Sequence, residues 1–131
     1  MNQQLLSLVW QRAENRCEYY RMPHPQYRLP FQIDHIIARQ HGGETVSENL
    51  ALACFHCNRF KGPNIAGIDP HSGELVRLFH PRIDSWDEHF RFDRVRVTGM
   101  TAIGRATVQV LAMNASDLLT LRLELLEENL L

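Results

Sequence analysis

The chain has 131 residues, 44% of them hydrophobic, and its formal net charge at pH 7 is -1. Such a chain is long enough to bury a hydrophobic core without disulfide bonds, and its composition argues against disorder. No apolar run approaches the roughly 20 residues that a membrane-spanning helix needs, and residues 1–4 lack the features of a signal peptide. We expect one domain over residues 1–131, located in the cytoplasm and not associated with a membrane.

The cysteines and the basic residues narrow the choice of partners. The three cysteines form an odd set, which argues against a disulfide framework and, in a reducing compartment, favours metal binding. All but one of the 14 basic residues are arginine, which binds phosphate oxygens through two parallel hydrogen bonds. Charge alone favours an ordinary solvated surface, because acidic and basic residues nearly balance.

A helix and a stiff connection are predicted at the start of the chain. Apolar residues recur with helical spacing over residues 3–16, which predicts an N-terminal helix. A helix is excluded in the following stretch, because three prolines fix the backbone and remove donors. These prolines are Pro23, Pro25 and Pro30.

Two short strands and a helix are predicted next. Apolar residues favour strands over residues 31–36 and 50–53, with a turn at residues 40–43 between them. A short helix is expected to begin near Cys57 or Asn58, because glycine and proline follow shortly after and end it. Two strands and a helix within about 30 residues form one small supersecondary unit.

The second half of the chain predicts a small sheet and two helices. Residues 64–73 are rich in glycine and proline and are expected to form a loop. Helical spacing favours helices over residues 103–113 and 116–126, with Ser116 as a good N-cap. Alternating residues predict a small antiparallel sheet from residues 75–80, 90–92 and 95–97.

Polar residues suited to phosphodiester hydrolysis lie within the predicted strand–strand–helix unit. This reaction needs an activated water and neutralisation of the charge that develops on phosphate. Asp34 and Asn58 offer the oxygen ligands that a hard cation such as Mg2+ prefers. Histidine is the side chain whose ordinary chemistry suits proton transfer near neutral pH, so His35 is a candidate general base, and Asn49 can accept a hydrogen bond from one of its nitrogens.

Each of these residues also has a simpler interpretation. An isolated Asp-His pair usually lies on the solvent-exposed surface without a specific role, and an asparagine after Ser47-Glu48 is usually a turn or cap residue. Asn58 alone would most simply be the N-cap of the short helix. Their joint occurrence in this order and spacing favours a catalytic set.

The chain resembles the HNH endonucleases, which are nucleases of the ββα-metal, treble-clef-like class. The resemblance to the core covers about residues 12–63, and the remainder, about 64–131, resembles a standalone bacterial branch often seen in cyanobacteria. It implies an α+β fold in which an N-terminal helix, a small antiparallel sheet and C-terminal helices embellish the core. The motifs that carry it are Arg16-Cys17-Glu18-Tyr19, Gln32 to Ile37, Gly42-Gly43, Glu48-Asn49-Leu50 and Leu52 to Gly62.

The resemblance implies a role for each motif residue. His35 matches the general base, Asn49 the residue that orients it, and Asp34 and Asn58 the metal ligands. The implied reaction is cleavage of DNA, expected to be double-stranded, with Mg2+ or Mn2+ as the cofactor. Arg59 and Lys61 follow on the same helix and are expected to meet phosphate, although an exposed helical face is the simpler interpretation.

One position departs from the family pattern. The family often carries two Cys-x-x-Cys knuckles that share a structural zinc; here Cys54 and Cys57 are intact, but Cys17 is followed by Tyr20 at the partner position. Zinc prefers four ligands, and a phenol is a poor substitute. The open outcomes are thiols without zinc, zinc with His24 or His56 as the fourth ligand, and zinc with water. The first is slightly favoured.

Two rival functions use the same residues differently. A catalytically silent module on this fold would bind nucleic acid or protein without cutting, and the complete set of Asp34, His35, Asn49 and Asn58 argues against it. A structural zinc-knuckle protein is the second rival, and Tyr20 weakens it. The nuclease is therefore the favoured prediction.

Overall fold

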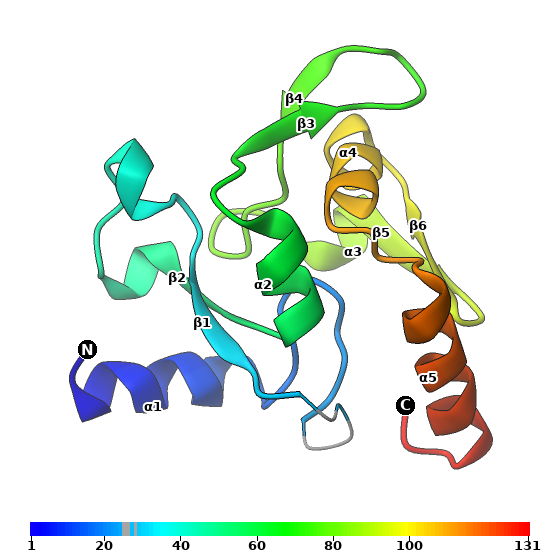
Figure 1. The fold of residues 1–131 in the computed structure, drawn as a ribbon, viewed down its shortest axis with the longest axis horizontal. Coiled ribbons are helices and arrows are strands. Elements are labelled where there is room, and N and C mark those ends of the chain that lie inside the picture. The colour runs from blue at the N-terminus through cyan, green and yellow to red at the C-terminus, as the bar shows by residue number, and fades with distance from the viewer. Residues whose placement is uncertain (25–26, 28) are drawn as a thin grey trace.

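The computed structural model describes residues 1–24, 27 and 29–131, and Pro25 of the predicted stiff connection lies outside them. Helices and short strands alternate along the chain (Figure 1), which makes the fold α+β as predicted. The elements are α1 (Gln3–Arg12), β1 (Gln32–His35), η1 (Arg39–His41), η2 (Ser47–Asn49), β2 (Leu50–Ala53), α2 (Phe55–Lys61), β3 (Ala66–Ile68), β4 (Leu75–Arg77), α3 (Trp86–His89), β5 (Phe90–Asp93), β6 (Arg96–Gly99), α4 (Ala102–Val110) and α5 (Ser116–Glu127).

The first helix is shorter than its apolar spacing predicts. Asn2 caps α1, because its side chain accepts a hydrogen bond from the Leu5 amide at 2.8 Å. The helix ends at Arg12 rather than near residue 16, because Glu14 and Asn15 adopt left-handed backbone conformations, with φ of 54° and 58°. The chain then turns so that Arg16 forms an isolated β-bridge with Pro23.

The predicted strand–strand–helix unit forms at the centre of the molecule (Figure 1). β1 and β2 pair antiparallel with Asp34 opposite Ala51, and all four residues of β2 are buried. α2 begins at Phe55, earlier than predicted, because the Cys54 side chain accepts the Cys57 amide and caps it. Asn58 therefore lies inside the helix and is not its N-cap.

The loop between β1 and β2 requires a glycine at one position. A Cβ atom on Gly43 would lie 1.7 Å from the Ile37 carbonyl oxygen and 2.8 Å from Nδ2 of Asn49. No other residue fits this close approach without moving the backbone. The Gly42-Gly43 turn predicted from sequence therefore brings two sides of the loop into contact.

The second half of the chain forms separate hairpins instead of one small sheet. β3 pairs with β4 and β5 pairs with β6, and each pair is its own two-stranded sheet. β3 lies inside the segment that was predicted to be a loop. The sequence pattern does not reveal this strand, because it is only three residues long and Gly67 at its centre interrupts any alternation of apolar and polar residues. A Cβ on Gly67 would lie 2.5 Å from Val110, so this glycine lets α4 pack against the β3–β4 hairpin.

The C-terminal helices complete the core. α5 begins at Ser116, but Ala115 occupies the N-cap position without a side-chain cap, so the prediction of Ser116 as the N-cap is wrong. Leu118 and Leu125 of the apolar stripe are buried, as expected for a helix that packs on the core. The same stripe buries Arg122, which is 1% exposed, and apolar periodicity gives no sign of this. No helix in the described ranges of the chain has the length and apolar character needed to cross a membrane.

Candidate active site and cysteine cluster

Asp34 is buried beneath α2. Asp34 is 4% exposed, and its Oδ2 accepts a hydrogen bond of 2.7 Å from the Tyr19 hydroxyl. Nζ of Lys61 lies 3.3 Å from Oδ1 and 3.2 Å from Oδ2. Burial raises the pKa of the Asp34 carboxyl group above its ordinary value, while Lys61 and Tyr19 act in the opposite direction. Both carboxylate oxygens are therefore engaged by the protein itself.

Lys61 does not lie on an exposed helical face, and its contact with phosphate stays a prediction. The residue is 1% exposed, and its ammonium also donates to the His35 carbonyl oxygen at 3.2 Å. A buried ammonium needs such partners, because desolvation without them costs several kcal/mol. Lys61 instead links the end of α2 to β1.

His35 lies on the opposite face of β1 from Asp34, because successive side chains of a strand alternate. Its imidazole is partly exposed, and Nε2 lies 2.8 Å from the Thr45 hydroxyl oxygen. Nδ1 has no hydrogen-bond partner among the described residues. Sequence reasoning missed Thr45, because nothing in the sequence marks this loop residue as a partner of His35.

Asn49 does not contact the imidazole as predicted, because its carboxamide is used elsewhere. Its Oδ1 accepts the Ile37 amide at 2.8 Å, and its Nδ2 donates to the carbonyl oxygens of Ile37 and Glu44 at 3.0 and 2.9 Å. These bonds close the loop that follows β1. Thr45 is the next residue after Glu44, so Asn49 acts on His35 only through the loop.

Asn58 faces β1 from the middle of α2. Its amide nitrogen donates to Oε1 of Gln32, a residue that sequence reasoning did not single out. Gln32 and Asp34 share one face of β1 by their two-residue spacing, and Asn58 and Lys61 share one face of α2 by their three-residue spacing. The two predicted metal ligands therefore belong to the same β1–α2 contact.

Arg59 is exposed on α2, as its simpler interpretation expects. Its guanidinium carbon lies 6.0 Å from the centre of the Phe60 ring, and no ion pair to an acidic residue is found in the described part of the chain. Arg59 is therefore the cation of α2 that remains available to a phosphate.

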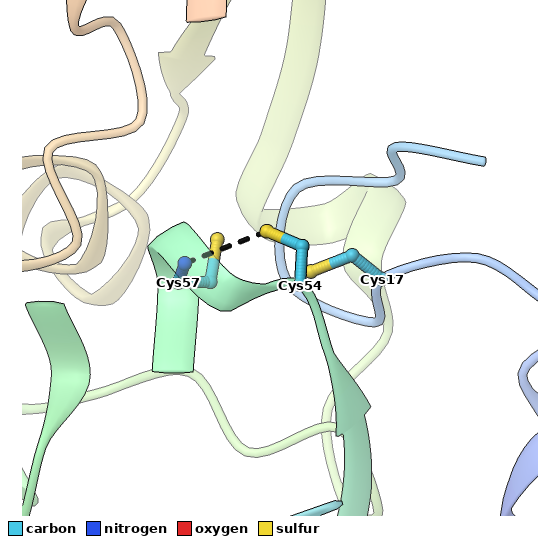
Figure 2. Close-up of side chains that lie close together, drawn as sticks. All are labelled: Cys17, Cys54 and Cys57. Carbon is cyan, nitrogen blue, oxygen red and sulfur yellow. Dashed lines mark hydrogen bonds between the residues drawn. The ribbon is translucent and has the colours of Figure 1, made fainter. Parts of the chain in front are cut away.

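Three buried sulfur atoms gather where β2 meets α2. Figure 2 shows Cys17 approaching Cys54 and Cys57 from the N-terminal loop. The three Sγ atoms all lie within 4.8 Å of one another, and none of the cysteines is exposed. Cys17 and Cys54 each accept a backbone amide three residues on, from Tyr20 at 3.3 Å and Cys57 at 3.4 Å. These residues can supply three of the four ligands of a zinc ion.

The comparisons with known proteins agree with the motif analysis. Residues 17–64 match the family model described as HNH endonuclease. This segment is an HNH domain. The domains of this family act on nucleic acids and use divalent metal ions. No curated protein and no solved structure matches the chain.

The HNH domain lacks a histidine as fourth ligand beside its three cysteines. His24 packs edge-on against Trp10 and Phe31, with ring centres 5.2 Å apart in both pairs. His56 directs Nε2 to the carbonyl oxygens at residues 111 and 112, both at 2.9 Å. Within the described residues, the metal-ligating group contains neither histidine.

The three thiols shift one another's pKa values. Burial raises the pKa of Cys17, but hydrogen bonds from Cys54 and Cys57 outweigh it and lower that pKa. The pKa of Cys57 is raised by burial and by its sulfur neighbours, and that of Cys54 is raised mainly by its hydrogen bond to Cys17. A lowered pKa favours the thiolate, which is the form of cysteine that binds a metal ion.

Proposed function

We propose that this protein is a metal-dependent endonuclease that hydrolyses DNA phosphodiester bonds. The observation that carries the proposal is that β1 and α2 supply Asp34, His35 and Asn58 within the segment that matches the HNH model, and that His35 is held at Nε2 while Nδ1 has no partner among the described residues. The β1–β2–α2 unit would be the ββα core, and the rest of residues 1–131 would belong to the same domain.

His35 would be the general base. When Nε2–H donates its hydrogen bond to the Thr45 hydroxyl oxygen, the lone pair of Nδ1 is free to take a proton from water. Asn49 would be a positioning residue, since it closes the loop that carries Thr45. Arg59, exposed on α2, would bind a phosphate oxygen of the substrate.

The donor chemistry fits a hard cation. Asp34 offers a carboxylate and Asn58 a carboxamide, which are the oxygen ligands that Mg2+ and Mn2+ prefer. Bound there, the cation would neutralise negative charge on the phosphate and the leaving oxygen. Asp34 now holds Lys61 at 3.2 Å, so Lys61 would have to release one carboxylate oxygen first. Metal binding and the Asp34–Lys61 ion pair therefore compete.

A plasmid-nicking assay with Mg2+ or Mn2+ tests the proposal. We expect His35→Ala to lower the cleavage rate by roughly 100-fold or more, which is the usual contribution of a general base. His41→Ala is the matched control, because it removes an exposed imidazole from η1, in the connection that follows β1, and leaves the β1–α2 contact unchanged. Equal cleavage by the wild type and His35→Ala would reject this function.

A binding module without cleavage is a second candidate. The ion pair between Asp34 and Lys61 favours it, because this pair saturates the carboxylate that a metal would need. Such a module would bind DNA but leave plasmids intact with Mg2+, Mn2+ and Ni2+. Metal-dependent nicking that depends on His35 would reject this candidate.

A further inference from the structure

A buried arginine on α5 forms no ion pair with an acidic residue among the described residues. Arg122 is 1% exposed, and its Nε and Nη1 atoms have no hydrogen-bond partner among the residues that the structure describes. Arginine is rarely buried unless it is paired, because desolvation of an uncompensated charge is costly. This position therefore requires a physical explanation.

Two aromatic rings enclose the Arg122 guanidinium. Its central carbon lies 3.8 Å from the centre of the Phe92 ring and 4.9 Å from that of Tyr20. Ring faces attract a cation, but they accept no ordinary hydrogen bond and carry no net charge. Burial lowers the pKa of Arg122; Tyr20 opposes this change, and nearby Arg16 lowers the pKa further.

Arg122 lines a cavity of about 250 Å³ together with three more arginines. These are Arg16 and Arg21, both half-buried, and Arg94, which is exposed. No acidic side chain lines the cavity, and in the described part of the chain none of the four arginines forms an ion pair with one. Asp87 lines only the adjoining hollow, which shares Arg16, Arg21 and Phe92 with this cavity.

Two of the rim arginines are held in place. Arg16 donates from Nη1 to the Arg21 carbonyl oxygen at 3.1 Å, and the Arg21 guanidinium lies 4.8 Å from the centre of the Trp86 ring. Side chains held in this way lose less conformational freedom on binding a ligand. The cavity thus combines four guanidinium groups, two of them fixed at its rim and one buried at its wall.

We propose that this cavity is a phosphate-binding site, with Arg122 as its buried ligand and Arg16, Arg21 and Arg94 at its rim. A phosphate group offers several charged oxygens, and guanidinium forks bind these in pairs. The phosphate of a nucleic-acid strand and free inorganic phosphate share this chemistry.

The site is separate from the proposed nuclease centre. None of Asp34, His35, Asn49 or Asn58 lines the cavity, and binding there needs no cleavage. His35→Ala should therefore bind phosphate as the wild type does. Failure of the nuclease proposal and failure of this one are then distinguishable.

Calorimetric titration tests the site without added divalent cations. Inorganic phosphate and a short single-stranded oligonucleotide are titrated in turn into the wild type, Arg94→Gln and Arg91→Gln. Arg91→Gln is the matched control, because it removes an exposed arginine of the same hairpin that does not line the cavity. We expect Arg94→Gln to raise the dissociation constant about tenfold and Arg91→Gln to change it less than twofold.

The outcomes separate the two sources of phosphate. Arg94-dependent binding of both probes, with phosphate competing against the oligonucleotide, supports a nucleic-acid site. Arg94-dependent binding of inorganic phosphate alone supports a site for free phosphate. Absence of binding by both probes, or equal weakening by Arg94→Gln and Arg91→Gln, would overturn the proposal. Arg122→Met tests the buried ligand, since its folded form, verified by circular dichroism, should lose binding of both probes.

Discussion

Two cationic side chains are buried, Lys61 and Arg122, and they differ in whether an acidic residue neutralises them. Lys61 at the end of α2 is neutralised by Asp34 and also donates to a backbone carbonyl. Arg122 in the middle of α5 lies against the rings of Tyr20 and Phe92, and its Nε and Nη1 have no hydrogen-bond partner among the described residues. Both residues are 1% exposed, so burial alone does not distinguish them.

The difference shows which charge the fold itself requires. Asp34 and Lys61 compensate each other, so the chain needs each of them to keep the other buried. Arg122 neutralises no acidic group among the described residues, and the desolvation of its charge therefore lowers the stability of the fold. A buried charge without an internal partner is more readily explained by an external ligand than by stability.

Replacing Lys61 should produce the largest loss of stability. Lys61→Met removes one partner of a buried pair and leaves the Asp34 carboxylate without a counter-charge, which we expect to cost about 3–5 kcal/mol. Urea denaturation at neutral pH measures the loss. Arg59→Met, which removes an exposed cation from the same helix, should change the free energy of unfolding by no more than about 0.5 kcal/mol. Equal effects would mean that the ion pair contributes nothing.

The loss in Lys61→Met should depend on pH. Lys61 lowers the pKa of Asp34, and burial raises it, so removal of Lys61 moves this pKa further above its unfolded value. A raised carboxyl pKa stabilises the fold at low pH, and that stability is lost as the pH rises through the folded pKa. The difference in free energy of unfolding between the wild type and Lys61→Met should therefore become smaller as the pH falls from 7 toward 5. A gap that widens would contradict a buried carboxylate at Asp34.

The same two cations show what the sequence can predict. The order β1, β2, α2 followed from apolar runs and from the motifs, because each is encoded by neighbouring residues. The burial of Lys61 did not, since a lysine three residues after Asn58 looks like any exposed helical cation. Its partner Asp34 lies on another element, and only tertiary packing brings the two together. Thr45 and Gln32 were missed for the same reason.

The second half of the chain was less predictable. The pairing of β5 with β6 follows from local alternation, and the hairpin is short in sequence. The strand β3 carries no such signal, because its three residues gain their partner from β4 across a glycine-rich turn. Arg122 lies on an otherwise apolar stripe, where periodicity predicts a buried hydrophobic residue. Such departures from pattern are where functional residues are expected.

Tyr20 links the cysteine cluster to Arg122 and gives the next prediction. Tyr20→Cys places a thiol at the fourth ligand position but removes a fully buried ring, so without metal we expect a loss of about 2–4 kcal/mol. Added zinc should raise the melting temperature of this variant more than that of the wild type. Tyr20→Ser is the control, since it leaves the same space without a thiol. An equal response of Tyr20→Cys and Tyr20→Ser to zinc would reject the lost-ligand explanation.

Replacing Arg122 should have the smallest effect and the opposite sign to the loss at Lys61. In Arg122→Met the desolvation cost of the charge disappears, while the attraction of two rings is lost, so we expect a gain of about 1 kcal/mol or less. Urea denaturation in phosphate-free buffer measures it, with Arg94→Met as the exposed control. A loss as large as that in Lys61→Met would mean that the chain satisfies Arg122 internally. The two cations would then be equivalent, and burial of Arg122 would require no ligand.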